Sequence, residues 1–128
     1  ISLTYMNVTE FSKRVGLNPH TVRYYDKIGL LDDVHRLSNG HRSFSEKDVT
    51  WIEFVQRLKN TGMPLEKILE YALLRKKGSE TLAQRKELLA EHSSNLQQRI
   101  SLEKQHLKKL CEKIELYQSA LEGKTSLD

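Results

Sequence analysis

Apolar residues in the first 30 positions recur at helical spacing in two short runs, and each run ends at a glycine. In the first run, Phe11 and Val15 lie four residues apart after Thr9, whose hydroxyl can cap a helix, and the run stops at Gly16. This pattern predicts a helix of two turns with Thr9 as its N-cap.

The second run begins at Asn18, which can cap a helix whose first position suits Pro19, and it ends at Gly29. Three apolar residues share one face of this run: Val22, Tyr25 and Ile28. Two short helices joined by the connection "GLN" predict a helix-turn-helix.

Helical periodicity breaks between residues 34 and 44. The pair Asn39 and Gly40 in this segment tolerates the positive φ that a type I′ turn requires, which is typical of a tight hairpin. The segment therefore predicts a two-stranded wing behind the two short helices.

A third and a fourth helix are expected after the wing. Ser45 followed by Asp48 resembles a capping box, and Gly62 marks the end of the helix that it opens. Four apolar residues form the inner face of that helix: Val49, Ile52, Val55 and Leu58. Pro64 then starts another helix, which runs to about Leu74.

From Glu80 to about Leu121 the chain has neither proline nor glycine, and its apolar residues follow a heptad pattern. The seam positions are Leu82, Leu89, Leu96, Ile100, Leu107, Leu110, Ile114, Tyr117 and Leu121. At about 1.5 Å per residue this helix is roughly 60 Å long, more than the first 75 residues can cover. We therefore expect its partner to be the same helix of a second copy, in a homodimer with twofold symmetry.

Composition excludes several classes of protein. A chain of 128 residues, 38% of them hydrophobic, suffices for one modest domain with an extension. It contains no run of 18 apolar residues and no basic-then-apolar leader, so we expect neither a membrane span nor a secretory signal, and a cytoplasmic location. The net charge of +4 favours an acidic partner only weakly. The single cysteine, Cys111, excludes an internal disulfide and an all-cysteine metal site within one chain.

The exposed side of the second predicted helix carries residue types that bind DNA. A helix of this kind fits the major groove, where its first residues face base edges and its arginines and tyrosines reach phosphates. Four side chains are available for such contacts: Thr21, Arg23, Tyr24 and Lys27. We interpret Tyr24 as a contact residue and Tyr25 as a core residue; the alternative is that both tyrosines are core aromatics.

The predicted wing is free of carboxylates between Asp33 and Glu46, and it carries four basic or titratable side chains around its turn: His35, Arg36, His41 and Arg42. A basic loop alone is usually a solvated surface. Behind a helix-turn-helix it indicates a second clamp on the phosphate backbone, to which the amides of Asn39, Gly40 and His41 can also donate.

Together these elements predict a mainly α chain with a small β wing. We place a winged helix-turn-helix domain at 6–75, a linker at 76–79, a coiled-coil dimerisation helix at 80–121 and a short tail at 122–128.

The stretches "TVRYYDKIGLL", "R…NGHRSF" and "LKNTGMPLEKI" resemble the MerR family of transcription regulators, from Met6 to about Leu121. The resemblance implies a dimer joined by an antiparallel coiled coil. It also implies activation by bending and untwisting a promoter whose spacer is too long for RNA polymerase. It assigns DNA contacts to Arg23, Tyr24, Arg36, Asn39, Gly40 and Arg42, and adds Thr21 and His41. We place Lys59 in the turn region after the third helix, where it can contact a phosphate.

The inducer is less well defined by the sequence. Metal-sensing relatives place cysteines near the end of the long helix, but this chain ends in "LEGKTSLD", so we expect neither a metal nor a cofactor. The stretch "LKNTGM" most resembles the branch that answers aldehydes or nitrosative stress, in which a sensing cysteine stands where this chain has Arg57. Cys111 is then either the sensor or, as we favour, a packed small hydrophobe beside Leu110.

Three other classes of protein stay as alternatives. An enzyme is disfavoured, because the chain has neither a phosphate loop nor a nucleophile with a paired base. A scaffold that dimerises through its coil without binding DNA predicts no salt-dependent DNA affinity. A coiled-coil architectural DNA-binding protein would bind DNA without a polymerase-linked role.

Overall fold

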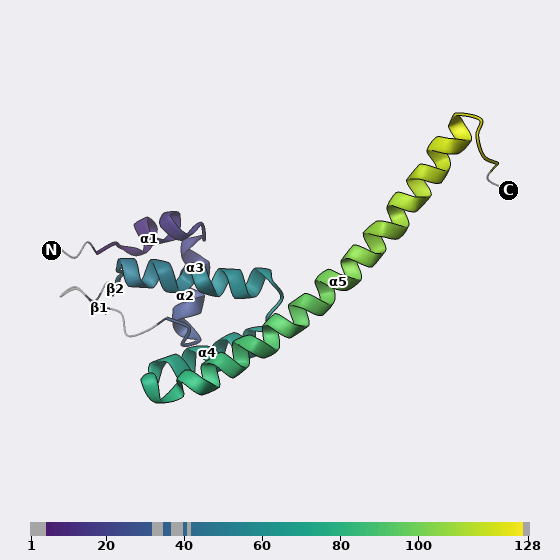
Figure 1. The fold of residues 1–128 in the computed structure, drawn as a ribbon. Helices are drawn as coiled ribbons and strands as arrows, with labels where there is room; N and C mark the ends of the chain where they lie inside the picture. Colours follow the sequence, from purple (N-terminus) through teal and green to yellow (C-terminus); the bar gives the residue numbers. More distant parts are fainter. Residues whose placement is uncertain (1–4, 32–34, 37–39, 41, 127–128) are drawn as a thin grey trace. The chain divides into compact units, whose positions relative to one another are not determined.

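The computed structural model describes residues 5–31, 35–36, 40 and 42–126 (Figure 1). The chain forms two compact units, residues 1–88 and 89–128. The boundary between the units falls inside the last helix. The division into a DNA-binding domain at 6–75 and a dimerisation helix at 80–121 therefore stays a prediction.

Helix α1 (Val8–Val15) begins one residue after Asn7, which is its N-cap. The Asn7 side chain accepts a hydrogen bond from the Glu10 amide at 2.8 Å, and the Glu10 carboxylate accepts one from the Asn7 amide at 3.1 Å. The predicted cap at Thr9 was wrong, because this reciprocal capping box satisfies the free amides two residues earlier. Gly16 ends the helix at φ +72°, as the sequence predicted.

Helix α2 (Pro19–Lys27) has the start that the sequence predicted. The Asn18 side chain accepts a hydrogen bond from the Thr21 amide at 2.7 Å, and Pro19 takes the first helical position. Val22 and Tyr25 are buried, which confirms Tyr25 as a core residue.

The wing consists of strands β1 (His35–Arg36) and β2 (Arg42–Ser43), which pair antiparallel with Arg36 opposite Arg42. Beside them, Met6 and Phe44 exchange two backbone hydrogen bonds of 2.7 Å. The proposed contact residues Asn39 and His41 lie outside the described part of the chain.

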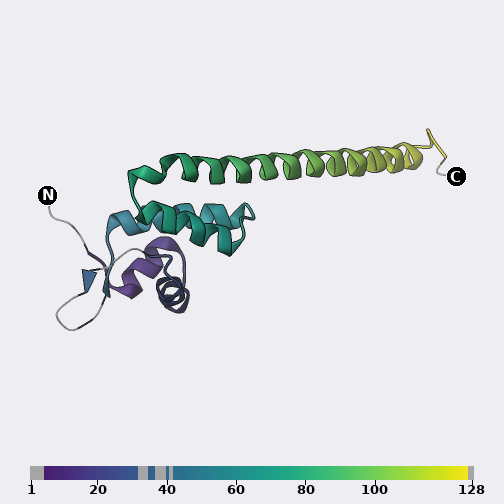
Figure 2. The ribbon, with the colours of Figure 1, turned by 90° about the horizontal axis from the view of Figure 1, so that it is seen from below.

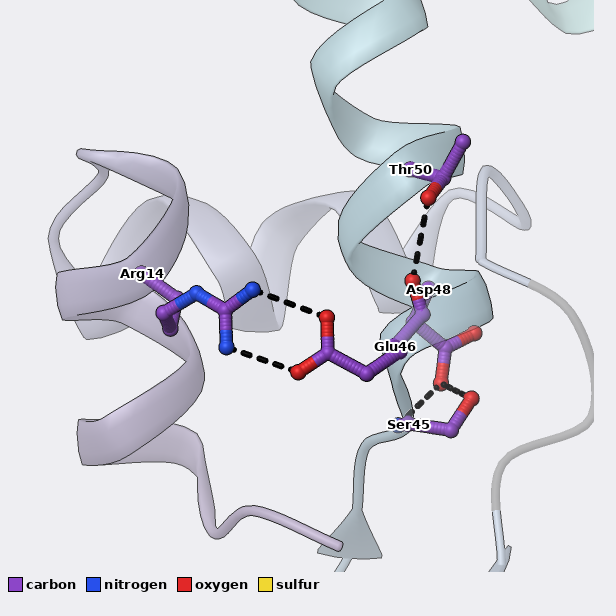
Figure 3. Close-up of polar contacts among 5 residues, drawn as sticks. All are labelled: Arg14, Ser45, Glu46, Asp48 and Thr50. Carbon is purple, nitrogen blue, oxygen red and sulfur yellow. Dashed lines mark hydrogen bonds and ion pairs between the residues drawn. The ribbon is translucent and has the colours of Figure 1, made fainter. Parts of the chain in front are cut away.

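Helices α3 (Glu46–Asn60) and α4 (Leu65–Lys76) follow, then the short 3₁₀ helix η1 (Ser79–Thr81). The predicted box at the start of α3 is present: the Asp48 carboxylate accepts hydrogen bonds from the Ser45 amide and hydroxyl at 2.9 and 3.2 Å (Figure 3). All four apolar residues predicted for the inner face of α3 are buried.

One core joins these elements. The rings of Phe11 and Phe44 stack 4.3 Å apart at 9°, so that α1 packs against the segment just after β2. Leu30, Ile52 and Ile68 are also fully buried. The buried side of α2 is therefore packed on this core, and its other side is exposed.

Helix α5 (Leu82–Leu121) runs for 40 residues without a break (Figure 2). Seven predicted seam residues, Leu82, Ile100, Leu107, Leu110, Ile114, Tyr117 and Leu121, are between 45% and 83% exposed, whereas Leu89 and Leu96 are half-buried. A row of large apolar side chains is thus open on this helix. No helix among the described residues is long and apolar enough to cross a membrane.

Candidate nucleic-acid interface

The outer side of α2 presents the side chains that the sequence singled out. Arg23 and Lys27 are exposed, Tyr24 is 46% exposed, and Thr21 is half-buried in the first turn. The exposed face therefore offers two cations and a phenol ring, a combination that can bind phosphates and base edges.

The wing is tied to α2 by an ion pair. The Arg42 guanidinium of β2 pairs with the Asp26 carboxylate of α2, and the two side chains are only 26% and 19% exposed. Asp26 was not among the residues predicted for the interface. Its only signal is a carboxylate between Tyr24 and Lys27, on the side of a helix that otherwise carries cations.

Helix α2 and the wing also border one hollow of about 500 Å³. Arg23 and Asp26 line it from α2, and Gly40 and Arg42 line it from the wing. Arg36 stands directly opposite Arg42 in the β ladder. The structure thus brings Arg23 of α2 and Arg42 of the wing to the border of one hollow, as two clamping elements require.

Lys59 lies in the last turn of α3, not in the turn that follows it. Its ammonium group is 3.4 Å from the Tyr25 hydroxyl and 5.9 Å from the centre of the Tyr25 ring. These contacts place the Lys59 ammonium group against Tyr25, a buried residue of α2.

Two long-range hydrogen bonds hold the end of α2. The indole of Trp51 donates to the Leu30 carbonyl at 2.8 Å, and the Lys76 ammonium donates to the Gly29 carbonyl at 3.0 Å. Helices α3 and α4 therefore position α2 through the loop that follows it.

A bidentate ion pair links α1 to the first turn of α3. The Arg14 guanidinium donates to both oxygens of Glu46 at 2.7 and 2.8 Å (Figure 3). This hydrogen-bonded pair lowers the pKa of Glu46 and raises the pKa of Arg14.

Two positions are relevant to sensing: Arg57, which takes the place of the branch's cysteine, and Cys111. Arg57 is exposed in the last turn of α3, and Cys111 is exposed on α5. Within a single chain, Cys111 is therefore not packed; packing in a dimer seam stays a prediction.

Family models match most of this architecture. The model described as "MerR HTH family regulatory protein" matches residues 6–73, and the model described as "MerR, DNA binding" matches residues 49–110. The first match includes α1, α2, the wing and α3, and the second reaches into α5.

Individual proteins agree with this assignment. The chain is 37% identical over 91 residues to the HTH-type transcriptional regulator AdhR of Bacillus subtilis, covering 71% of this chain and 65% of AdhR. It is 36% identical over 109 residues to an uncharacterized HTH-type transcriptional regulator of Haemophilus influenzae, covering 85% of this chain and 81% of that protein.

Solved structures share the fold. A MerR family structure from Listeria monocytogenes gives a TM-score of 0.86 at 34% identity, covering 91% of this chain and 88% of that one. The structure of HiNmlR, a MerR family regulator lacking the sensor domain and bound to promoter DNA, gives a TM-score of 0.82 at 34% identity. That match covers 91% of this chain and 93% of HiNmlR.

Proposed function

The chain belongs to the MerR family of DNA-binding transcriptional regulators, and we propose that it binds a palindromic promoter as a homodimer and activates transcription by reshaping that promoter. The observation that carries the proposal is the exposed basic side of α2, joined to the wing by the pair between Asp26 and Arg42. The HiNmlR complex supports DNA as the partner, because that related protein was solved on promoter DNA.

Each protomer contacts one half-site in this proposal. Helix α2 enters the major groove, and the wing and Lys59 bind the backbone on either side. The proposed contact residues are Thr21, Arg23, Tyr24, Lys27, Arg36, Asn39, Gly40, His41, Arg42 and Lys59.

The dimer forms through α5. Seven of the nine seam residues are more than two-fifths exposed in one chain, and leaving a row of leucine and isoleucine side chains in water is costly. Pairing of two antiparallel α5 helices covers this row.

Activation follows from clamping DNA at four places. Two α2 helices and two wings add phosphate contacts that offset a DNA deformation of several kcal/mol, on the order of what bending a short site costs. The bent and untwisted promoter brings the −35 and −10 elements of an overlong spacer into line for RNA polymerase.

We also propose that the regulon belongs to a stress or aldehyde-detoxification response, on the strength of the "LKNTGM" stretch and the similarity to AdhR. Because Arg57 stands at the sensing position of that branch, electrophile sensing has moved to Cys111 or has been lost. The comparison of the wild type with Cys111→Ser in the presence of an aldehyde separates these two routes.

The proposal is tested by DNA-binding isotherms on a palindromic promoter fragment at several salt concentrations. We expect the logarithm of affinity to fall with the logarithm of salt with a slope of about −5 or steeper, because each neutralised phosphate contributes about −0.9. A flat salt dependence contradicts DNA binding and supports the scaffold alternative.

Two variants at adjacent exposed positions of α5 test dimerisation. Ile100→Asp places a carboxylate in the seam, and Ser101→Asp places the same carboxylate just outside it. Sedimentation should show a monomer and a loss of palindrome binding for Ile100→Asp only. If the two variants have the same oligomeric state and the same affinity for the palindrome, the proposed dimer seam is wrong.

A further inference from the structure

A second hollow, of about 690 Å³, lies away from α2 and the wing, between α3, α4 and the first turns of α5. Three aromatic side chains form one wall. Trp51 stacks on Tyr71 at 6.0 Å and 14°, and Phe54 lies 6.3 Å from Trp51 and 5.7 Å from Tyr71. An open hollow with aromatic side chains on one wall can receive a flat small molecule.

The charges around this hollow are mostly positive. Its lining contains four cations, Lys47, Arg57, Arg75 and Arg85, and two carboxylates, Glu46 and Glu53. Arg14, which does not line the hollow, binds both oxygens of Glu46 and lowers the pKa of that carboxyl, so that Glu46 is ionised and already neutralised. The cations therefore dominate the field inside the hollow.

Two of these arginines are held in place by neighbours. The Arg75 guanidinium carbon lies 4.2 Å from the centre of the Trp51 ring. Arg85 donates from Nε to the Thr81 hydroxyl and from Nη2 to the Gly78 carbonyl, both at 3.1 Å. Side chains ordered in advance lose less entropy when they bind a ligand, and a guanidinium fork matches the geometry of a carboxylate.

We propose that this hollow binds a small organic anion with a flat apolar body, of the aromatic carboxylate class. The ring of the ligand lies against Phe54 and Tyr71, and its carboxylate accepts hydrogen bonds from Arg57 and Arg85. All of these residues lie outside the candidate nucleic-acid interface, so the inference does not rest on the proposed function.

Trp51 provides a direct readout, because it is the only tryptophan of the chain and lines the hollow. Titration of the full chain with benzoate should change its fluorescence saturably. Arg57→Gln should weaken this binding about tenfold, the expected effect of losing one charge-assisted hydrogen bond. Benzamide, which has the same ring without the charge, should bind correspondingly less well.

Two further variants test whether the charge at the hollow, rather than the net charge of the protein, controls benzoate binding. Arg14→Gln should weaken benzoate binding as well, because it frees the charge of Glu46 at the edge of the hollow. Arg23→Gln makes the same change in net charge on α2, and it should weaken DNA binding while leaving the benzoate titration unchanged. DNA binding and the benzoate titration therefore test the two proposals separately.

The inference is overturned if benzoate gives no saturable change at millimolar concentration. It is also overturned if benzamide and benzoate bind equally and Arg57→Gln has no effect, because the hollow would then select only apolar bulk. Circular dichroism of each variant checks that the helices are intact.

Discussion

Replacing Asp26 with asparagine tests whether the wing is positioned by its ion pair with α2. Asp26→Asn removes a negative charge from a surface that we assign to DNA, so simple charge counting predicts tighter binding. The geometry predicts the opposite, because Asp26 fixes the guanidinium of Arg42, and the two side chains are mostly buried together.

The magnitudes decide between these effects. A carboxylate about 10 Å from a phosphate in water repels it by about 0.4 kcal/mol, and physiological salt screens most of that. A hydrogen bond from Arg42 to a DNA phosphate contributes about 1.5–3 kcal/mol to binding. Part of this free energy is lost when Asp26 no longer holds Arg42 in position. We therefore expect a net loss of about 1 kcal/mol, or about fivefold in affinity.

The assay is fluorescence anisotropy of the palindromic fragment with four proteins: the wild type, Asp26→Asn, Arg42→Gln and the double variant. Asp26→Asn should bind about fivefold less tightly alone but should cost nothing when Arg42 is already replaced. Glu53→Gln, which makes the same change in net charge on α3, serves as the control. Tighter binding by Asp26→Asn, or a loss that persists in the Arg42→Gln background, refutes the reasoning.

Three other results are expected. Phe11→Ala should lower the free energy of unfolding by about 3–5 kcal/mol in chemical denaturation, because it empties a fully buried site against Phe44; a cost below about 1 kcal/mol contradicts this packing. Glu46→Gln should destabilise the protein above pH 4.5, the ordinary pKa of the carboxyl, and have progressively less effect as pH falls through the lowered folded value, because a depressed pKa stabilises only where the group is ionised. Equal destabilisation in acid and at neutral pH would show that the Arg14 pair is not the cause. Cys111→Ser should leave the affinity for the palindrome within about twofold without an aldehyde, since the thiol is exposed on α5; a larger change in anisotropy would assign it a structural role in the dimer.

Local patterns in the sequence predicted most of the elements. Asn18 and Pro19 fix the start of α2, and Gly29 at φ +86° follows its end, through short-range hydrogen bonds and backbone geometry that a sequence displays directly. The same reasoning misplaced the start of α1, because Thr9 and Asn7 are both good caps. The choice between them depends on Glu10, which lies three residues after Asn7 and completes the box.

Contacts between distant segments were harder to predict from the sequence. The pairing of Asp26 with Arg42 depends on how the wing lies against α2, and no periodicity along the chain reports that packing. The aromatic hollow likewise forms only when α3, α4 and the start of α5 pack together, so that Trp51, Tyr71 and Arg85 meet. Such tertiary contacts cannot be read from the pattern of any one helix.

The most direct test of the central proposal is in vitro transcription from a promoter that carries the palindrome in an overlong spacer, beside a derivative whose spacer is shortened to ordinary length. If the dimer works by bending and untwisting DNA, it should stimulate RNA polymerase on the long spacer and give no stimulation on the short one. Equal stimulation of both promoters, or none on the long one despite tight binding, would contradict the mechanism.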